Sequence, residues 1–123
     1  MATILLVEDN SQNMKLATLV LQGAGHQVVQ ATDAKEALEL ARLHQPALVL
    51  MDINLPGIDG LEATRRIKAD SQTASIKIYA LTAYAMPGDE TRILAAGCDG
   101  YMSKPIHHRE LRRLVEAALQ SSS

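Results

Sequence analysis

The segment that decides the fold is Ala47-Leu48-Val49-Leu50-Met51-Asp52, an unbroken apolar run that ends in a carboxylate. A run without alternating polar residues is typical of a strand buried on both faces of a parallel sheet. The loop Ile53-Asn54-Leu55-Pro56-Gly57 follows at once and contains proline and glycine, the residues of turns. Asp52 is therefore expected where a central strand gives way to a loop.

Four other apolar runs repeat this plan along the chain. Together with the central run they lie at about residues 3–7, 27–31, 47–51, 76–81 and 99–102, and a segment long enough for a helix separates each from the next. Strands that alternate with helices predict a parallel sheet with crossover helices. We expect one doubly wound α/β domain over residues 1–120, with residues 121–123 as a frayed tail.

The segments between the runs carry helix signals. Asp33 and Asp59 each stand three residues before a glutamate, which resembles a capping box. Pro87 and the acids after it predict another helix start, and Gly97 predicts the end of that helix. A last helix is expected from about residue 108 to 119, with apolar residues at helical spacing.

Composition limits the class of protein. The chain has 123 residues, enough for one domain, and its formal net charge of -2 does not suggest an electrostatic nucleic-acid binder. Cys98 is the single cysteine, and no apolar stretch approaches the ~20 residues of a membrane span. Tryptophan and phenylalanine are absent, so the core must be aliphatic with methionine as filler. A reducing, cytoplasmic setting is expected.

Polar residues close several of the predicted strands. Glu8 and Asp9 follow the first run, Asp52 ends the third, Thr82 ends the fourth and Lys104 follows the fifth. The carboxyl ends of parallel strands form one edge of a doubly wound sheet, and ligands bind there. Three acids, a hydroxyl and an amine at one edge are suited to hold a divalent cation together with a phosphoryl group.

The expected chemistry follows from these residue types. Magnesium prefers oxygen ligands and is held by one or two carboxylates with a phosphate oxygen, so Asp9 and Asp52 are the expected direct ligands, with Glu8 direct or through water. A carboxylate can also be the nucleophile of aspartyl-phosphate chemistry, and Asp52 is the better candidate because it stands alone at its strand end. Lys104 would supply positive charge to the transferred group.

Each of these residues also has a purely structural interpretation. Acids at strand ends often cap the next helix, Lys104 and Pro105 are compatible with an ordinary turn, and Thr82 with a half-buried strand residue. Their coincidence on one edge favours chemistry. Four histidines lack the spacing of metal ligands and are expected at the surface or at caps: His26, His44, His107 and His108.

Two other features carry weaker signals. Cys98 is expected to be a small buried hydrophobe. The basic cluster of Arg109, Arg112 and Arg113 is expected to be a solvated helix face, with an acidic partner as the alternative.

At this point the motifs resemble a known family along essentially the whole chain: the response regulator receiver domain of two-component signalling, in the CheY-like superfamily. The segments that carry the resemblance are Val7-Glu8-Asp9-Asn10, Met51-Asp52-Ile53-Asn54-Leu55-Pro56-Gly57-Ile58-Asp59-Gly60, Leu81-Thr82-Ala83 and Gly97-Cys98-Asp99-Gly100-Tyr101-Met102-Ser103-Lys104-Pro105. The resemblance implies a flavodoxin-like sheet with strand order 2-1-3-4-5 and five helices.

The resemblance also implies roles for the acids. Asp52 would accept a phosphoryl group from the phosphohistidine of a histidine kinase or a histidine phosphotransferase. Magnesium or manganese would be held by Glu8, Asp9 and Asp52, and by the backbone carbonyl of Asn54. Members of the family more often have aspartate at the position of Glu8, so the mode of its metal contact stays open.

A switch is implied as well. Thr82 would hydrogen-bond a phosphoryl oxygen, Lys104 would ion-pair with another, and Tyr101 would turn inward behind Thr82. A cis peptide bond is expected before Pro105.

Signal output to a downstream protein would use the fourth helix, the fifth strand and the fifth helix, with neither nucleic acid nor membrane as a direct partner. Tyr84 stands where the family tunes the lifetime of the phosphoryl group.

Several alternatives remain open from the sequence. Stand-alone DivK-like regulators and receivers attached to hybrid histidine kinases both resemble this chain, and the first is preferred. A phosphohydrolase with an aspartyl-phosphate intermediate would need an acid where Asn54 stands. A flavin carrier would need donors where Glu8 and Asp9 stand. A receiver-like protein that is never modified is disfavoured by the intact acids, Thr82 and Lys104.

Overall fold

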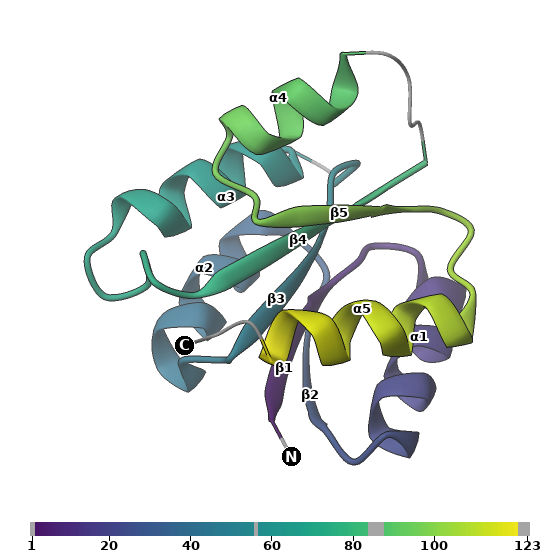
Figure 1. Cartoon of the computed structure of the whole chain (residues 1–123). Coiled ribbons are helices and arrows are strands. Elements are labelled where there is room, and N and C mark those ends of the chain that lie inside the picture. The colour runs from purple at the N-terminus through teal and green to yellow at the C-terminus, as the bar shows by residue number, and fades with distance from the viewer. Residues whose placement is uncertain (1, 56, 84–87, 121–123) are drawn as a thin grey trace.

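The computed structural model describes residues 2–55, 57–83 and 88–120. Within these ranges five strands alternate with five helices (Figure 1). They are β1 (Thr3–Val7), α1 (Ser11–Gly23), β2 (Gln27–Ala31), α2 (Ala34–His44), β3 (Leu48–Asp52), α3 (Gly60–Ala69), β4 (Lys77–Thr82), α4 (Asp89–Ala95), β5 (Gly100–Ser103) and α5 (His108–Gln120).

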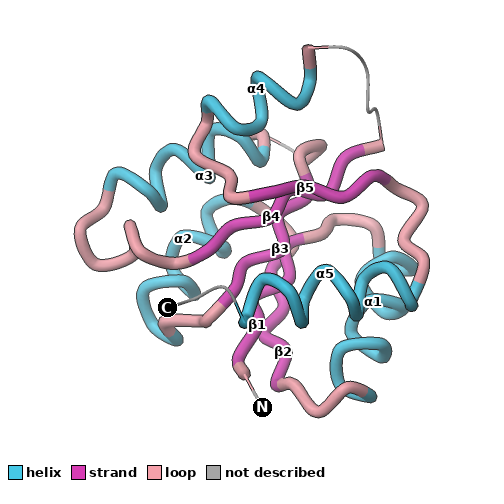
Figure 2. Tube along the Cα trace, viewed as in Figure 1, coloured by secondary structure: helices cyan, strands magenta, loops and turns pink. Residues whose placement is uncertain are grey.

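The strands form one parallel sheet in the order β2-β1-β3-β4-β5, which confirms the predicted fold and strand order. Leu50 of β3 lies between Leu6 of β1 and Tyr79 of β4. Helices α1 and α5 cover one face of the sheet, and α2, α3 and α4 cover the other (Figures 1 and 2). The fold is therefore a three-layer α/β arrangement whose strands all end at one edge.

The core consists of two apolar clusters, one on each face of the sheet. Every residue of β3 is buried, as expected for a strand covered on both faces. Met51 belongs to the cluster under α2, α3 and α4, whereas Met14 and Met102 belong to the one under α1 and α5. Burial of this aliphatic surface holds the carboxyl ends of β1 and β3 in place.

The two predicted acidic caps are present, but neither is a full capping box. Asp33 Oδ1 accepts a hydrogen bond from the Glu36 amide at 2.8 Å, and Asp59 Oδ1 accepts one from the Glu62 amide at 2.9 Å. Glu36 then accepts from the Thr32 amide rather than from the cap residue. The caps thus start α2 and α3 where the sequence predicted.

Helix α4 begins within the segment that the sequence predicted. The helix begins at Asp89 with Gly88 as its cap, at a φ of 94° that favours glycine, while Pro87 lies outside the described residues. The predicted stop holds, because α4 ends at Ala95 and Gly97 follows with a φ of 106°. The predicted tail, 121–123, also lies outside the described residues.

Gly60 is required by the close approach of α3 to the end of β3. Its amide donates a hydrogen bond to the Ile53 carbonyl at 2.9 Å. A Cβ atom at this position would lie 2.8 Å from Ile53 Cα and closer still to the Asp52 carbonyl oxygen. Both neighbours are backbone atoms of the strand exit, so a side chain here would displace the segment that carries Asp52.

We predict that Gly60→Ala destabilises the protein by about 1 to 3 kcal/mol, because backbone must shift to admit the methyl group. Equilibrium unfolding in urea measures the change. Gly23→Ala, at the end of α1, is the matched control, since a Cβ there meets nothing within 4 Å. It is expected to leave stability unchanged or to raise it by about 0.5 to 1 kcal/mol. Equal unfolding midpoints for the two variants would contradict the steric argument.

Candidate functional site

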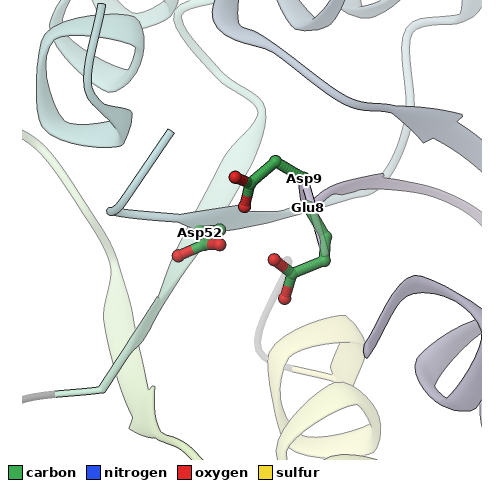
Figure 3. A group of neighbouring side chains, drawn as sticks. All are labelled: Glu8, Asp9 and Asp52. Atoms are coloured by element: carbon green, nitrogen blue, oxygen red, sulfur yellow. The ribbon is translucent and has the colours of Figure 1, made fainter. Parts of the chain in front are cut away.

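Three carboxylates meet at the carboxyl edge of the sheet. Glu8 and Asp9 follow β1, and Asp52 is the last residue of the neighbouring strand β3. Figure 3 shows the three side chains grouped at this edge, and one carboxylate oxygen of each lies within 4.8 Å of one from each of the others. The two central strands therefore bring together the acids that the sequence singled out.

These acids differ in their exposure. Glu8 and Asp52 are each only 1% exposed, whereas Asp9 is exposed. Acidic residues are almost never fully buried unless they are paired, because desolvation of a charge is costly. The burial of two carboxylates side by side therefore requires compensation from a neighbouring cation.

Lys104 is that cation. Its Nζ lies 2.9 Å from Glu8 Oε1 and 3.0 Å from Asp52 Oδ2. The peptide bond between Lys104 and Pro105 is cis, as the resemblance implied, and the Lys104 amide donates to the Thr82 carbonyl at 2.7 Å. Burial alone would lower the pKa of Lys104, but its contacts with Glu8 and Asp52 outweigh burial and raise the pKa above its ordinary value.

The electrostatics of Glu8 show that one ammonium group is not enough. Burial and then the nearby Asp52 raise the pKa of Glu8 to about 7, with Lys104 opposing the shift. Glu8 Oε1 is buried and accepts no aligned hydrogen bond, although it lies close to Lys104 Nζ. The site is thus short of positive charge, and its all-oxygen donor set has the chemistry that a hard divalent cation prefers.

Backbone amides orient both buried acids. The Asn54 amide donates to Asp52 Oδ1 at 3.0 Å, and the Asn10 amide approaches Glu8 Oε2 at 3.3 Å. In each case the donor lies two residues after the acid, as in a turn closed by a carboxylate. Sequence reasoning missed these two amides, although an acid at a strand exit followed by turn residues is their signal.

The remaining predicted site residues lie on the strands at the other side of Asp52. Thr82 ends β4, is 4% exposed and pairs with Ser103 of β5. Tyr101 of β5 is 36% exposed, so its ring lies at the surface in this state of the protein. Tyr84 lies outside the described residues.

Comparison with known proteins agrees with this geometry. Residues 4–116 match the family model described as response regulator receiver domain. The chain is 46% identical over 104 residues, 85% of each chain, to the polar-differentiation response regulator DivK of Brucella anthropi. No helix within the described ranges is both long and apolar enough to cross a membrane.

Solved structures are also similar to this chain. The receiver domain of the sensor histidine kinase PA1611 from Pseudomonas aeruginosa, which has a magnesium ion coordinated in its active site cleft, superposes with a TM-score of 0.90 at 37% identity over 98% of both chains. The chemotaxis protein CheY4 of Vibrio cholerae superposes with a TM-score of 0.92 at 28% identity, over 97% of this chain and 99% of that one. The chain belongs to the response regulator receiver domain family of two-component signalling.

Proposed function

We propose that this receiver domain accepts a phosphoryl group on Asp52 from the phosphohistidine of a histidine kinase or a histidine phosphotransferase. The observation that carries the proposal is the position of Lys104 Nζ, 3.0 Å from Asp52 Oδ2 at an edge that also holds Glu8 and Asp9. A carboxylate beside an ammonium group and further acids can bind a phosphoryl group together with a cation.

The transfer is a single displacement at phosphorus. One carboxylate oxygen of Asp52 attacks the phosphorus atom, and the phosphorus–nitrogen bond to the partner's imidazole breaks. Its electron pair stays on the imidazole nitrogen, and an acyl phosphate forms on Asp52. The Asn54 amide and Lys104 hold the two oxygens of Asp52, so the carboxylate is oriented before the partner arrives.

Magnesium or manganese fits the site. Glu8, Asp9 and Asp52 would hold the ion, with the Asn54 backbone carbonyl as a further ligand, and the buried Glu8 Oε1, which accepts no aligned hydrogen bond, supports this assignment. When bound, the ion neutralises negative charge on the phosphoryl oxygens. The magnesium in the PA1611 receiver supports this assignment.

The modified site would act as a switch. A phosphoryl group adds close to two negative charges, and charge-assisted hydrogen bonds from Thr82 and Lys104 would contribute roughly 3 to 6 kcal/mol together. A shift from 1:99 to 99:1 needs about 5.5 kcal/mol, so a partner completes the change. Tyr101 would leave its exposed position and turn inward behind Thr82, which alters the surface formed by α4, β5 and α5. A downstream protein would bind that surface.

The proposed chemistry is limited to the protein's own phosphorylation and dephosphorylation. Turnover of small phosphoesters by aspartyl-phosphate enzymes uses a second acid two residues after the nucleophile, and this position is Asn54. The cytoplasm is the proposed location, since the chain has one cysteine, the buried Cys98, and so contains no internal disulfide. Direct partners are proteins, and neither nucleic acid nor membrane is among them.

We predict that the metal-free protein loses stability as the pH rises, because the pKa of Glu8 is about 7 in the folded state against 4.5 for the ordinary group. An acid whose pKa is raised in the folded state contributes stability that is fully present below its ordinary pKa. This stability is lost as the pH rises through the folded-state pKa. The loss should be about 2 kcal/mol between roughly pH 5.5 and 8.

Urea unfolding in a chelating buffer tests this prediction, with Glu8→Gln as the comparison. The unfolding free energy of the wild type minus that of Glu8→Gln should fall as the pH rises, because only the wild type carries the Glu8 carboxyl group. The contributions of distant titrating groups, such as His26 with its lowered pKa, cancel in this difference. Parallel pH profiles for wild type and Glu8→Gln would contradict the assignment.

We predict that acetyl phosphate and magnesium modify the wild type but not Asp52→Asn. The intact mass of the wild type should rise by about 80 Da, the mass of one phosphoryl group, and a chelator should prevent the rise. Asp59→Asn is the matched control, because it changes an acid of the same loop while asparagine keeps the cap of α3. Modification of Asp52→Asn, or none of the wild type, would contradict the proposal.

We predict that Thr82→Ala separates modification from switching. The variant should gain the same mass with acetyl phosphate, but loss of one of two charge-assisted hydrogen bonds should lower its switched population by about 10- to 100-fold relative to the unswitched one. The ring resonances of Tyr101, assigned with Tyr101→Phe, report the population. Identical resonance shifts in phosphorylated wild type and Thr82→Ala would show that Thr82 is not part of the switch.

A further inference from the structure

The solvent face of α5 carries three exposed arginines within about one turn, Arg109, Arg112 and Arg113, which we call the α5 basic face. Arg113 lies four positions after Arg109, roughly 6 Å further along the helix axis. The opposite side of α5 is anchored in the core by Leu111, Val115 and Ala118. This anchoring fixes the rotation of α5, so the three guanidinium groups necessarily point to solvent.

None of these three arginines forms an ion pair with any residue that the structure describes. The other arginines of the chain are all paired: Arg42 with Asp70, Arg65 and Arg66 with Glu62, and Arg92 with Asp89. The contrast separates the α5 basic face from the ordinary charged surface of this protein.

The acids of α5 itself form no ion pair with the three arginines in the described part of the chain. In α3 and α4 the acid precedes the arginine by three or four positions, as Glu62 precedes Arg66, and this order is the favourable one. In α5, Glu116 follows Arg112 and Arg113, which is the less favourable order, whereas Glu110 precedes Arg113 by three positions in the favourable order and still forms no ion pair with it. The arginines are thus left available to groups outside the helix.

The helix dipole is also opposed by this placement. Helix α5 begins at His108, so Arg109 lies in its first turn, where the positive end of the dipole disfavours a cation. In α2 and α3 the last turn holds basic residues, Arg42 and Arg66 among them, whereas the last turn of α5 holds none. Arg109 is therefore placed where the dipole does not favour it, although Glu110 in the same turn does interact favourably with the dipole.

We propose that the α5 basic face binds an acidic segment of a partner protein. Planar guanidinium groups match carboxylates with two parallel hydrogen bonds each. The three arginines and Glu116 line a shallow depression of about 210 Å³, which admits carboxylate side chains. Glu116 repels acids at one end, so the partner's carboxylates would lie over the three arginines.

The number of cations favours a protein over other anionic partners. Membrane surfaces are bound by clusters of about four to eight basic residues, and nucleic acids by roughly six to ten phosphate contacts, whereas this face has three arginines on a chain of net charge -2. The inference rests on the proposed role of α5 in output, and it is independent of phosphoryl transfer to Asp52.

Two triple variants test the inference. The α5 variant is Arg109→Gln, Arg112→Gln and Arg113→Gln, and the control is Arg42→Gln, Arg65→Gln and Arg66→Gln on α2 and α3. Each removes three positive charges, so their net charges are equal. The probe is an octaglutamate peptide with a fluorescent label, and its dissociation constant is measured by anisotropy at low salt on the unmodified proteins.

The wild type, the control and Asp52→Asn should bind the peptide with similar affinity, and the α5 variant at least about fivefold more weakly. Since Arg109 opposes the dipole and none of the three arginines forms an ion pair in the described residues, the Tm of the α5 variant should be unchanged or about 1 to 3 °C higher than that of the wild type. This readout excludes unfolding as the cause of lost binding.

Four results would overturn the inference. They are no saturable binding of octaglutamate by the wild type, equal losses in the two triple variants, a lower Tm for the α5 variant, and tighter arginine-dependent binding to duplex DNA or to phosphatidylglycerol vesicles than to the peptide. Failure of Asp52 to accept a phosphoryl group would change none of these measurements, so the two proposals fail separately.

Discussion

The contact of one ammonium group with two buried carboxylates is the interaction on which the site depends. Lys104 Nζ lies within 3.0 Å of both Glu8 and Asp52, and these acids close the two central strands. Without a cation, two such carboxylates would repel each other in a region of low polarity. The contact also joins sheet positions that are distant along the chain, because Lys104 arrives from the far side of β4. The contact of Lys104 with Glu8 and Asp52 therefore constrains both the fold and the site.

Much of this arrangement was predictable because it follows from strand chemistry. The apolar run before Asp52 predicted a central strand, and the polar residues after each run predicted a common edge, since parallel strands end together. The strand order came from the resemblance to receiver domains rather than from periodicity. The helix caps at Asp33 and Asp59 could also be predicted from the sequence, because a capping acid acts within one turn of its own helix.

Features that depend on tertiary distances were not predictable. The amides of Asn10 and Asn54 hold the acids through loop geometry, and the need for glycine at position 60 appears only when α3 meets the end of β3. The raised pKa of Glu8 needs both its burial and its distance from Asp52, and neither can be read from a list of residues. The cluster of arginines on α5 was visible in the sequence, but their lack of ion pairs among the described residues was not.

The arrangement of α5 has a consequence for how receiver domains diversify. Its apolar side is committed to the core, while its exposed arginines form no ion pair with the acids of the site. On the binding role proposed for the α5 basic face, two duplicated copies of such a domain would acquire different partner proteins through changes in a few outward residues of one helix. The constraint imposed by Glu8, Asp52 and Lys104 would stay the same in both copies, and new signalling routes would arise without a new active site.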